Sequence, residues 1–262
     1  MAFENKFEEN FNLGEKCYID GKYEKAIEYF NKCIQIRESY DCLNYIGCCH
    51  LRLRNYDTAM KVFNSIITSC PNCERPVFNL GRVYLETNEL EKALECFKKS
   101  IKINPYNEDG YYYLGVYYQQ VGDLEQAKTF YQKSLEIDNE QSETYLNLGI
   151  CYFEQELFEE ALDAFSNAYK YDSECIEAIQ NKAFVYIDMK NYEKALKELY
   201  VFNNLVQDDI NNTLDIAHCY YKIHDFENSY TWVKKALDIE PENQFANKLF
   251  KILNSKLQNK KD

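Results

Sequence analysis

Hydrophobic residues recur every three or four positions through most of the chain, which is the spacing of one face of an α-helix. In residues 108–141 the apolar and small residues of a first predicted helix share one face: Tyr111, Leu114, Gly115 and Tyr118. Gly122 and Asp123 interrupt the pattern. A second predicted helix follows with its own apolar face: Leu124, Ala127, Tyr131 and Leu135. This stretch therefore predicts a helical hairpin.

The hairpin pattern returns along the chain at intervals of 33 and then 34 residues. A small residue in the first predicted helix marks the register: Gly14, Gly47, Gly81, Gly115, Gly149, Ala183 and Ala217. A small residue in the second predicted helix keeps the same intervals: Ala26, Ala59, Ala93, Ala127, Ala161, Ala195 and Ser229. A fixed period of this length is typical of stacked helical hairpins.

Glycine at the same place in five successive units indicates close packing. Inside a helix, glycine costs about 1 kcal/mol relative to alanine, so contacts must compensate for it. We predict that Gly115 faces Ala127 and lets the two helix backbones approach closely, with larger side chains interlocking beside them. One hairpin cannot bury both of its apolar faces, so each is expected to stack on the next.

This pattern resembles the tetratricopeptide repeat, because characteristic residues stand at fixed positions of each unit. In the unit that starts at residue 74 they are Val77, Leu80, Gly81, Tyr84, Ala93, Phe97 and Pro105. Seven units show the resemblance: residues 7–39, 40–73, 74–107, 108–141, 142–175, 176–209 and 210–243. Two departures are Lys182 and Thr213, which occupy expected apolar positions.

The resemblance implies an all-α, right-handed superhelical solenoid that forms one continuous array of seven hairpins. Pro71, Pro105 and Pro241 should end the second helices of their units, because proline cannot continue a helix. Residues 244–262 are expected to form a capping helix with a frayed tail, and Phe245, Leu249, Leu253 and Leu257 would share its apolar face.

The resemblance also implies a concave groove that is lined by the first helices and binds a peptide. The sixth position of the units reads Asn12, Tyr45, Asn79, Tyr113, Asn147, Asn181 and Asp215. Asparagine amides could pair with an extended peptide backbone. Further expected groove residues are Phe78, Arg82, Tyr112, Phe184 and His218. Two alternatives stay open: the asparagines are merely solvated, and Tyr45 and Tyr113 pack between neighbouring helices.

Charges in the expected groove give two hints about a ligand. The second position of the units is acidic in five of seven cases, with Arg75 and Asn211 as the exceptions. An acidic rim would attract a basic or amphipathic peptide, although acids also suit helix N-termini in general. Arg75 and Arg82 form a concentrated basic spot that could hold one acidic residue of a ligand. Chaperone-binding relatives use a lysine at the fifth position, where this chain has none.

Composition limits the partners and the location. The chain has 43 acidic and 30 basic residues, a formal net charge of −13, which would repel phosphate backbones and anionic lipids. We therefore expect neither nucleic acid nor a membrane as a partner. No secretory signal or lipid anchor is evident near the start, and eleven cysteines show no disulfide framework. A cytoplasmic location is expected.

The segment Cys70-Pro71-Asn72-Cys73 has the spacing of a redox or zinc site. No βαβ pattern surrounds it, as a thioredoxin-like motif would require. Zinc would need two more ligands, for which Cys33 and Cys42 are the candidates. We interpret Cys70 and Cys73 as free thiols at a junction between hairpins, and we expect no cofactor.

These observations predict a non-enzymatic adaptor that binds a peptide segment of a partner protein in its groove. A self-assembling structural scaffold is an alternative, because a solenoid has open ends. A thiol redox or zinc function at Cys70 and Cys73 is a third. Catalysis has little support, because His218 is the one histidine expected in the groove and no nucleophile is placed beside it.

Overall fold

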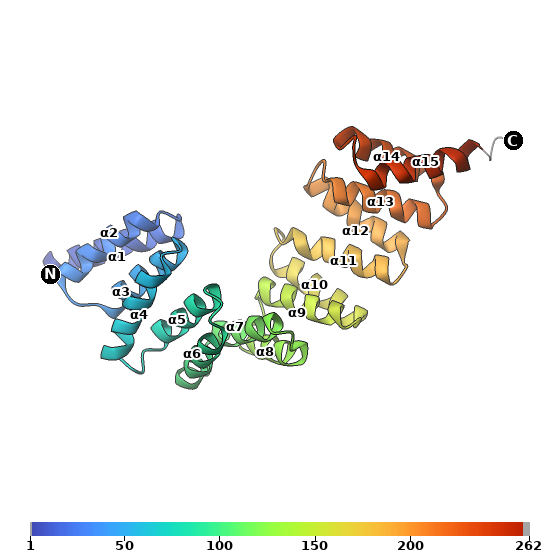
Figure 1. Cartoon of the computed structure of the whole chain (residues 1–262). Helices are drawn as coiled ribbons and strands as arrows, with labels where there is room; N and C mark the ends of the chain where they lie inside the picture. The colour runs from blue at the N-terminus through green and yellow to red at the C-terminus, as the bar shows by residue number, and fades with distance from the viewer. Residues whose placement is uncertain (1, 259–262) are drawn as a thin grey trace. The chain divides into compact units, whose positions relative to one another are not determined.

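The computed structural model describes residues 2–258, and all regular secondary structure in that range is helical (Figure 1). The fifteen helices are α1 (Ala2–Ile19), α2 (Tyr23–Ile36), α3 (Tyr40–Arg52), α4 (Tyr56–Ser69), α5 (Glu74–Glu86), α6 (Leu90–Ile103), α7 (Glu108–Gln120), α8 (Leu124–Ile137), α9 (Ser142–Glu154), α10 (Phe158–Tyr171), α11 (Ile176–Asp188), α12 (Tyr192–Leu205), α13 (Ile210–Lys222), α14 (Phe226–Ile239) and α15 (Gln244–Gln258). The predicted all-α fold is confirmed.

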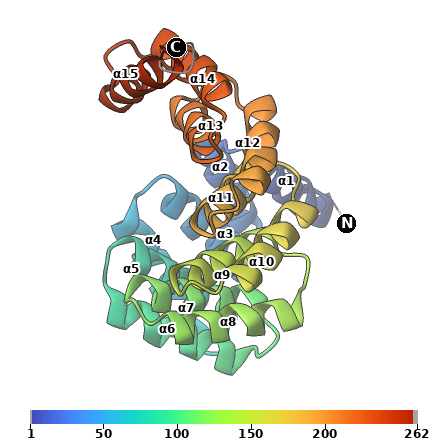
Figure 2. The ribbon, with the colours of Figure 1, turned by 90° about the vertical axis from the view of Figure 1, so that its right-hand side faces the viewer.

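The chain divides into two compact units. Unit 1, Met1–Asp138, contains α1 to α8, and unit 2, Asn139–Asp262, contains α9 to α15. Within each unit, an odd-numbered helix packs on the even-numbered helix that follows it, and this pair packs on the next odd-numbered helix. Figures 1 and 2 show these neighbours side by side from two directions. Each unit is therefore a stack of helical hairpins.

Three prolines mark helix ends as predicted. Helices α4, α6 and α14 each end two residues before a proline, at Pro71, Pro105 and Pro241 respectively. Proline disfavours helical geometry at the residue before it and lacks the N–H that would continue the helix. The turns between hairpins therefore have a direct cause in the sequence.

The glycines of the first helices do allow close packing, but their partner differs from the prediction. A Cβ atom at Gly115 would lie 2.5 Å from the Tyr131 ring, so the ring and not Ala127 is the nearest side chain. The same contact occurs in the four other hairpins that carry the glycine: Gly14 with Phe30, Gly47 with Phe63, Gly81 with Phe97, and Gly149 with Phe165. Each glycine leaves room for an aromatic ring from the second helix, which is why a larger residue is disfavoured there.

The two polar departures from the repeat pattern find partners. The Lys182 ammonium lies 3.1 Å from a carboxylate oxygen of Glu198 on the second helix of the same hairpin. The Thr213 hydroxyl is buried and donates a hydrogen bond of 2.7 Å to the backbone carbonyl of Asp209. Both polar groups are thus compensated, and the hairpins keep their packing.

Helix α15 covers the end of unit 2. It buries Ala246, Leu249 and Leu253 in a cluster with residues of α14, whereas Phe245 is half exposed, contrary to the predicted face. Lys251 is exposed and stands 34 residues after Ala217, at the position where the other hairpins have glycine or alanine. The predicted frayed tail, residues 257–262, begins within α15, which ends at Gln258, and its last four residues lie outside the described residues.

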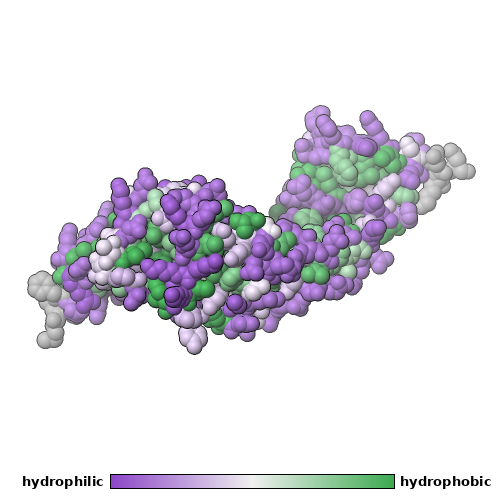
Figure 3. Space-filling model, turned by 60° about the horizontal axis from the view of Figure 1, so that its bottom comes forward, coloured by the Kyte–Doolittle hydropathy of each residue, from purple (hydrophilic) through white to green (hydrophobic). Residues whose placement is uncertain are grey.

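Hydrophilic side chains dominate the face of the molecule shown in Figure 3, and hydrophobic ones reach that surface in patches between them. Among the described residues, no helix combines the length and the apolar composition that crossing a bilayer requires.

Candidate functional site

Two adjoining clefts open on the first helices of unit 1. The large cleft, of about 420 Å³, is bordered by residues of α3, α5 and α7 and of the α6–α7 turn: Asn44, Tyr45, Glu74, Arg75, Phe78, Asn79, Arg82, Asn104, Tyr106, Asn107, Glu108 and Asp109. The small cleft, of about 210 Å³, is bordered by Leu51, Arg52, Arg54, Tyr56, Arg82, Leu85, Glu86 and Tyr113. Arg82 lines both clefts, so it lies where they meet.

Side-chain hydrogen bonds orient Arg82 at the junction of the two clefts. One terminal nitrogen of its guanidinium donates to Oδ1 of Asn79 over 3.2 Å. The Asn79 amide nitrogen in turn donates to Oδ1 of Asn44 over 3.1 Å. Asn79 is 6% exposed, which means that its amide is committed to this network and is not simply solvated. The predicted groove asparagine at 79 thus orients an arginine.

Aromatic rings surround the same guanidinium. The Arg82 guanidinium carbon lies 5.4 Å from the centre of the Tyr113 ring and 5.9 Å from that of Phe78. At these distances the ring faces attract the cation. The Phe78 and Tyr113 rings also contact each other, with 5.3 Å between their centres, and Tyr113 stacks on Phe97. Packing between neighbouring hairpins therefore holds the arginine in place.

Tyr45 serves mainly as a packing residue. Its ring stacks on Phe30 with 4.8 Å between centres, and its hydroxyl donates to a Glu15 carboxylate oxygen over 2.7 Å. Burial, helped by the neighbouring Glu15 carboxylate, raises the pKa of Tyr45 to about 12. One side of the residue still borders the large cleft. The alternative of packing between first helices thus describes Tyr45 and Tyr113 well.

Sequence reasoning identified Arg75 and Arg82 but missed Arg52, Arg54 and Asn44 at these clefts. The distribution of arginine in the sequence could have pointed to these residues. All five arginines of the chain lie between residues 37 and 82, and the 180 residues that follow contain lysine but no arginine. Arg37 pairs with Glu4. Among the described residues, the other four arginines have no carboxylate within ion-pair distance: Arg52, Arg54, Arg75 and Arg82.

The remaining predicted groove residues lie outside these clefts. Asn12 is exposed on α1, and Tyr112 is buried, with its ring against Tyr113 and Tyr131. Unit 2 carries four more, all half-buried: Asn147, Asn181, Phe184 and His218. Burial lowers the pKa of His218, whose ring contacts Tyr192. Both clefts are built from unit 1 residues alone.

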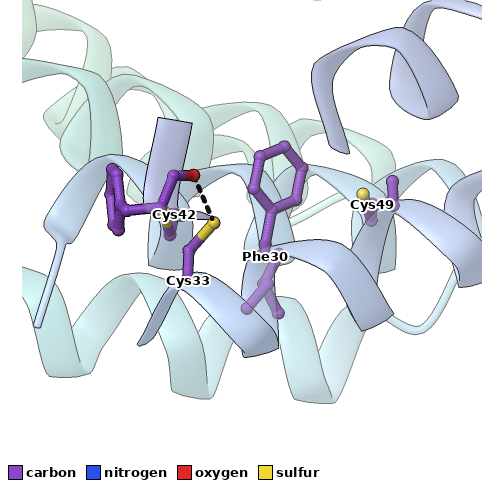
Figure 4. Close-up of a cluster of buried hydrophobic side chains, with 7 residues drawn as sticks. Phe30, Cys33, Cys42 and Cys49 are labelled. Atoms are coloured by element: carbon purple, nitrogen blue, oxygen red, sulfur yellow. Dashed lines mark hydrogen bonds between the residues drawn. The ribbon is translucent and has the colours of Figure 1, made fainter. Parts of the chain in front are cut away.

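The interpretation of Cys70 and Cys73 as free thiols is wrong, because the two residues form a disulfide. Cys70 follows α4 directly and Cys73 precedes α5, and the intervening turn brings their Cα atoms within 5.4 Å, a normal separation for a disulfide. The four thiols considered for zinc do not meet. Figure 4 shows Cys33 close to Cys42 in the core of the first hairpins, where the Cys33 thiol donates to the backbone carbonyl of Phe7.

Structural relatives share the hairpin stack at low sequence identity. The C-terminal part of a TPR repeat-containing protein from Cytophaga hutchinsonii aligns with a TM-score of 0.71 and 17% identity, over 91% of this chain and 98% of that one. A chain of the APC/C hetero-tetramer Cut9-Hcn1 gives 0.67 and 18% identity over 92% of this chain, which spans only 48% of that chain. YrrB, described as a TPR protein with an unusual peptide-binding site, gives 0.65 and 21% identity over 72% of this chain and 97% of its own.

Sequence models of known families lead to the same group of proteins. Models described as tetratricopeptide repeat match residues 7–40, 41–72 and 108–174, and one described as TPR repeat matches residues 81–122. No curated protein matches the chain. Since these models together cover more than half of the sequence, and both units are stacks of helical hairpins, the chain belongs to the tetratricopeptide repeat family.

Proposed function

We propose that this protein is a non-enzymatic adaptor that binds an extended or helical peptide segment of a partner protein on the first helices of its hairpins. The observation that carries the proposal is the large cleft of unit 1, where Tyr45, Phe78 and Asn79, from two neighbouring first helices, border an open surface. Aromatic rings and oriented amides are the groups that bind peptides in grooves of this kind.

The state of the cysteines fits a binding function better than a catalytic one. Burial raises the pKa of Cys33, Cys49 and Cys219 to about 12, so these thiols stay protonated near neutral pH. Cysteines 70 and 73 are joined to each other. Among the described residues, no three metal-ligating side chains converge. These facts support an adaptor that acts through its surface.

The partner segment that we propose is amphipathic and carries basic residues. The net charge of −13 would steer such a segment toward the protein. Apolar side chains of the segment would contact the ring edges that reach the clefts, and its backbone would pair with asparagine amides of first helices outside the Asn44–Asn79 network. Nine of the eleven cysteines are free, which favours a reducing compartment although Cys70 and Cys73 are joined, and we propose the cytoplasm as the site of action.

A peptide library can test the adaptor proposal while the partner is still unidentified. The probe is a phage-displayed library of random dodecapeptides that is selected on the purified full chain. Selected peptides are then titrated against a triple variant of the first helices, Asn79→Ala, Asn147→Ala and Asn181→Ala. The control triple variant changes exposed residues of the second helices α4 and α6: Lys61→Ala, Asn64→Ala and Lys98→Ala.

We expect about tenfold weaker binding, or more, for the first-helix variant and unchanged binding for the control. Circular dichroism must show that both variants keep their helical content. Failure to select any peptide, or equal affinity for both folded variants, would refute the adaptor proposal.

A further inference from the structure

We propose that the junction of the two clefts in unit 1 is a carboxylate subsite, in which the Arg82 guanidinium, with Arg52 and Arg75 beside it, binds an Asp or Glu side chain of the partner peptide. This inference rests on the proposed function and adds a specific acidic residue to an otherwise basic or amphipathic segment. It depends on three properties of the site, which are a missing counter-charge, rigid placement and two further arginines beside Arg82.

The first property is a half-buried cation without an internal counter-ion. Arg82 donates to the neutral amide oxygen of Asn79, and no carboxylate of the described residues lies within 4.0 Å of its guanidinium. Its Nε is fully covered and has no hydrogen-bond acceptor. A charge removed from water in this way is costly unless it is paired. A ligand carboxylate reaching Arg82 from either cleft would supply the missing pair.

The second property is rigidity before the ligand arrives. The Asn79 amide oxygen accepts from one end of the guanidinium and Asn79 is itself held by Asn44, while the Phe78 and Tyr113 rings lie beside the cation. A guanidinium that is already oriented loses little side-chain entropy on binding. Since one edge is occupied by Asn79, the remaining donors can form charge-assisted hydrogen bonds with a planar carboxylate.

The third property is the amount of positive charge around Arg82. Arg52 borders the small cleft and Arg75 the large one, both exposed to solvent. All three guanidiniums are close enough to Cys48 to oppose the rise of its pKa to about 11, which burial causes. Arg52 shares the small cleft with Arg82, and Arg75 shares the large cleft with it, so a carboxylate at the junction meets positive charge from both clefts.

Acidic residues on the same borders favour a carboxylate over a phosphate. Glu74, Glu108 and Asp109 border the large cleft and Glu86 borders the small one. A phosphate group carries a charge of about −1.5 to −2 near neutral pH and would be repelled more strongly by these acids than a carboxylate of charge −1. We therefore assign the subsite to a carboxylate.

The test uses four synthetic peptide libraries with random flanks and the intact chain. Three have blocked ends and differ in one fixed central residue, which is Glu, Gln or phosphoserine. The fourth has Gln at the centre and a free C-terminus, so it separates a side-chain carboxylate from a terminal one. Binding is measured by fluorescence polarisation for the wild type, Arg82→Gln and Lys98→Gln. The last variant makes the same change of charge on the exposed face of α6.

We expect the blocked Glu library to bind about tenfold more tightly than the blocked Gln library. The difference should vanish in Arg82→Gln and persist in Lys98→Gln, while thermal unfolding confirms that both variants are folded. Arg52→Gln, a change at an exposed residue, should reduce the difference partly and serves as the test if Arg82→Gln does not fold.

Four outcomes would overturn the assignment. Equal binding of the Glu and Gln libraries by the wild type would show that no acidic residue is recognised, although the adaptor proposal would stand. A Glu preference that survives Arg82→Gln would place the subsite elsewhere. Tighter, Arg82-dependent binding of phosphoserine or of the free C-terminus would identify a different anion. No binding by any library would refute the adaptor proposal together with this one.

Discussion

A Cβ atom on Gly149 would lie 2.6 Å from Cε1 of Phe165, closer than real side-chain contacts allow. In the next hairpin the corresponding residues are Ala183 and Leu199, and both are buried. In the last hairpin they are Ala217 and Val233. At this one repeat position, a glycine of the first helix stands against an aromatic residue, and an alanine stands against an aliphatic one. The two side chains therefore fill a similar combined volume in each hairpin, because a larger residue at one position is matched by a smaller one at the other.

This relationship predicts the effect of Gly149→Ala. Alanine favours the helix by about 1 kcal/mol, but the added methyl group collides with Phe165. We expect a net loss of about 1–2 kcal/mol in the free energy of unfolding, measured by urea titration of the helical circular dichroism signal. The double variant Gly149→Ala, Phe165→Leu reproduces the pair of the next hairpin and should recover most of the loss. A double variant no more stable than Gly149→Ala would contradict this interpretation.

The carboxyl group of Asp215 predicts a pH dependence of stability. Burial, with a smaller contribution from Asp209, raises the pKa of Asp215 to about 6 in the folded chain. Because the folded pKa exceeds the unfolded value, folding penalises the charged form. The penalty is absent below about pH 4, grows as the pH rises and is complete above about pH 6.

We therefore expect Asp215→Asn to stabilise the chain by roughly 2 kcal/mol at pH 7.5 and to have little effect at pH 4. Thermal unfolding at both pH values measures the difference. The exposed residue Asp238 provides a control, since Asp238→Asn should change neither value. An equal effect of Asp215→Asn at the two pH values would rule out a titration of this carboxyl group.

The disulfide between Cys70 and Cys73 predicts a thiol count. Eleven cysteines are present and nine of them are free. A thiol reagent should therefore label nine cysteines per chain when the protein is unfolded without reductant, and eleven after reduction. The double variant Cys70→Ser, Cys73→Ser should give nine in both conditions. Eleven reactive thiols in unreduced wild-type chain would show that the bond is absent in solution.

The ion pair between Lys182 and Glu198 predicts that removing one partner lowers the free energy of unfolding, whereas replacing both partners does not. Both side chains are about one-fifth exposed. Lys182→Leu restores the residue typical of the repeat but leaves the Glu198 carboxylate unpaired in a largely buried place, so we expect a loss of about 1 kcal/mol. Adding Glu198→Leu should return the free energy of unfolding to the wild-type value or above it. A single variant as stable as the wild type would show that the pair is immaterial.

The periodicity of apolar and small residues was enough to predict the helices and their pairing. The positions of Gly115 and Pro105, for example, fixed a register that the structure keeps. The side chain that contacts Gly115 could not be predicted in the same way. Helical spacing shows on which face of a helix a residue lies, but it does not show how the opposite helix is rotated about its axis. Tyr131 and Ala127 lie on the same face of α8, and only the packing decides which one meets the glycine.

The site was predicted less completely, for a physical reason. Repeat positions predict which side chains lie on the first helices, but they do not give the bonds among those side chains. Asn79 was expected to offer its amide to a ligand, and it instead holds Arg82 and Asn44. Arg52, the last residue of α3, stands at the thirteenth position of its unit, and the sequence alone does not show that it shares a cleft with Arg82.

Lys251 distinguishes α15 from the first helices of the hairpins. The charged side chain stands where such a hairpin would need a glycine or an alanine, and burying an unpaired ammonium there would cost more than the apolar contacts return. A second helix packed on α15 as in the other hairpins would therefore bring its large side chain against a lysine. The replacement Lys251→Ala would remove that obstacle and give α15 the small residue that the first helices of the hairpins have in common.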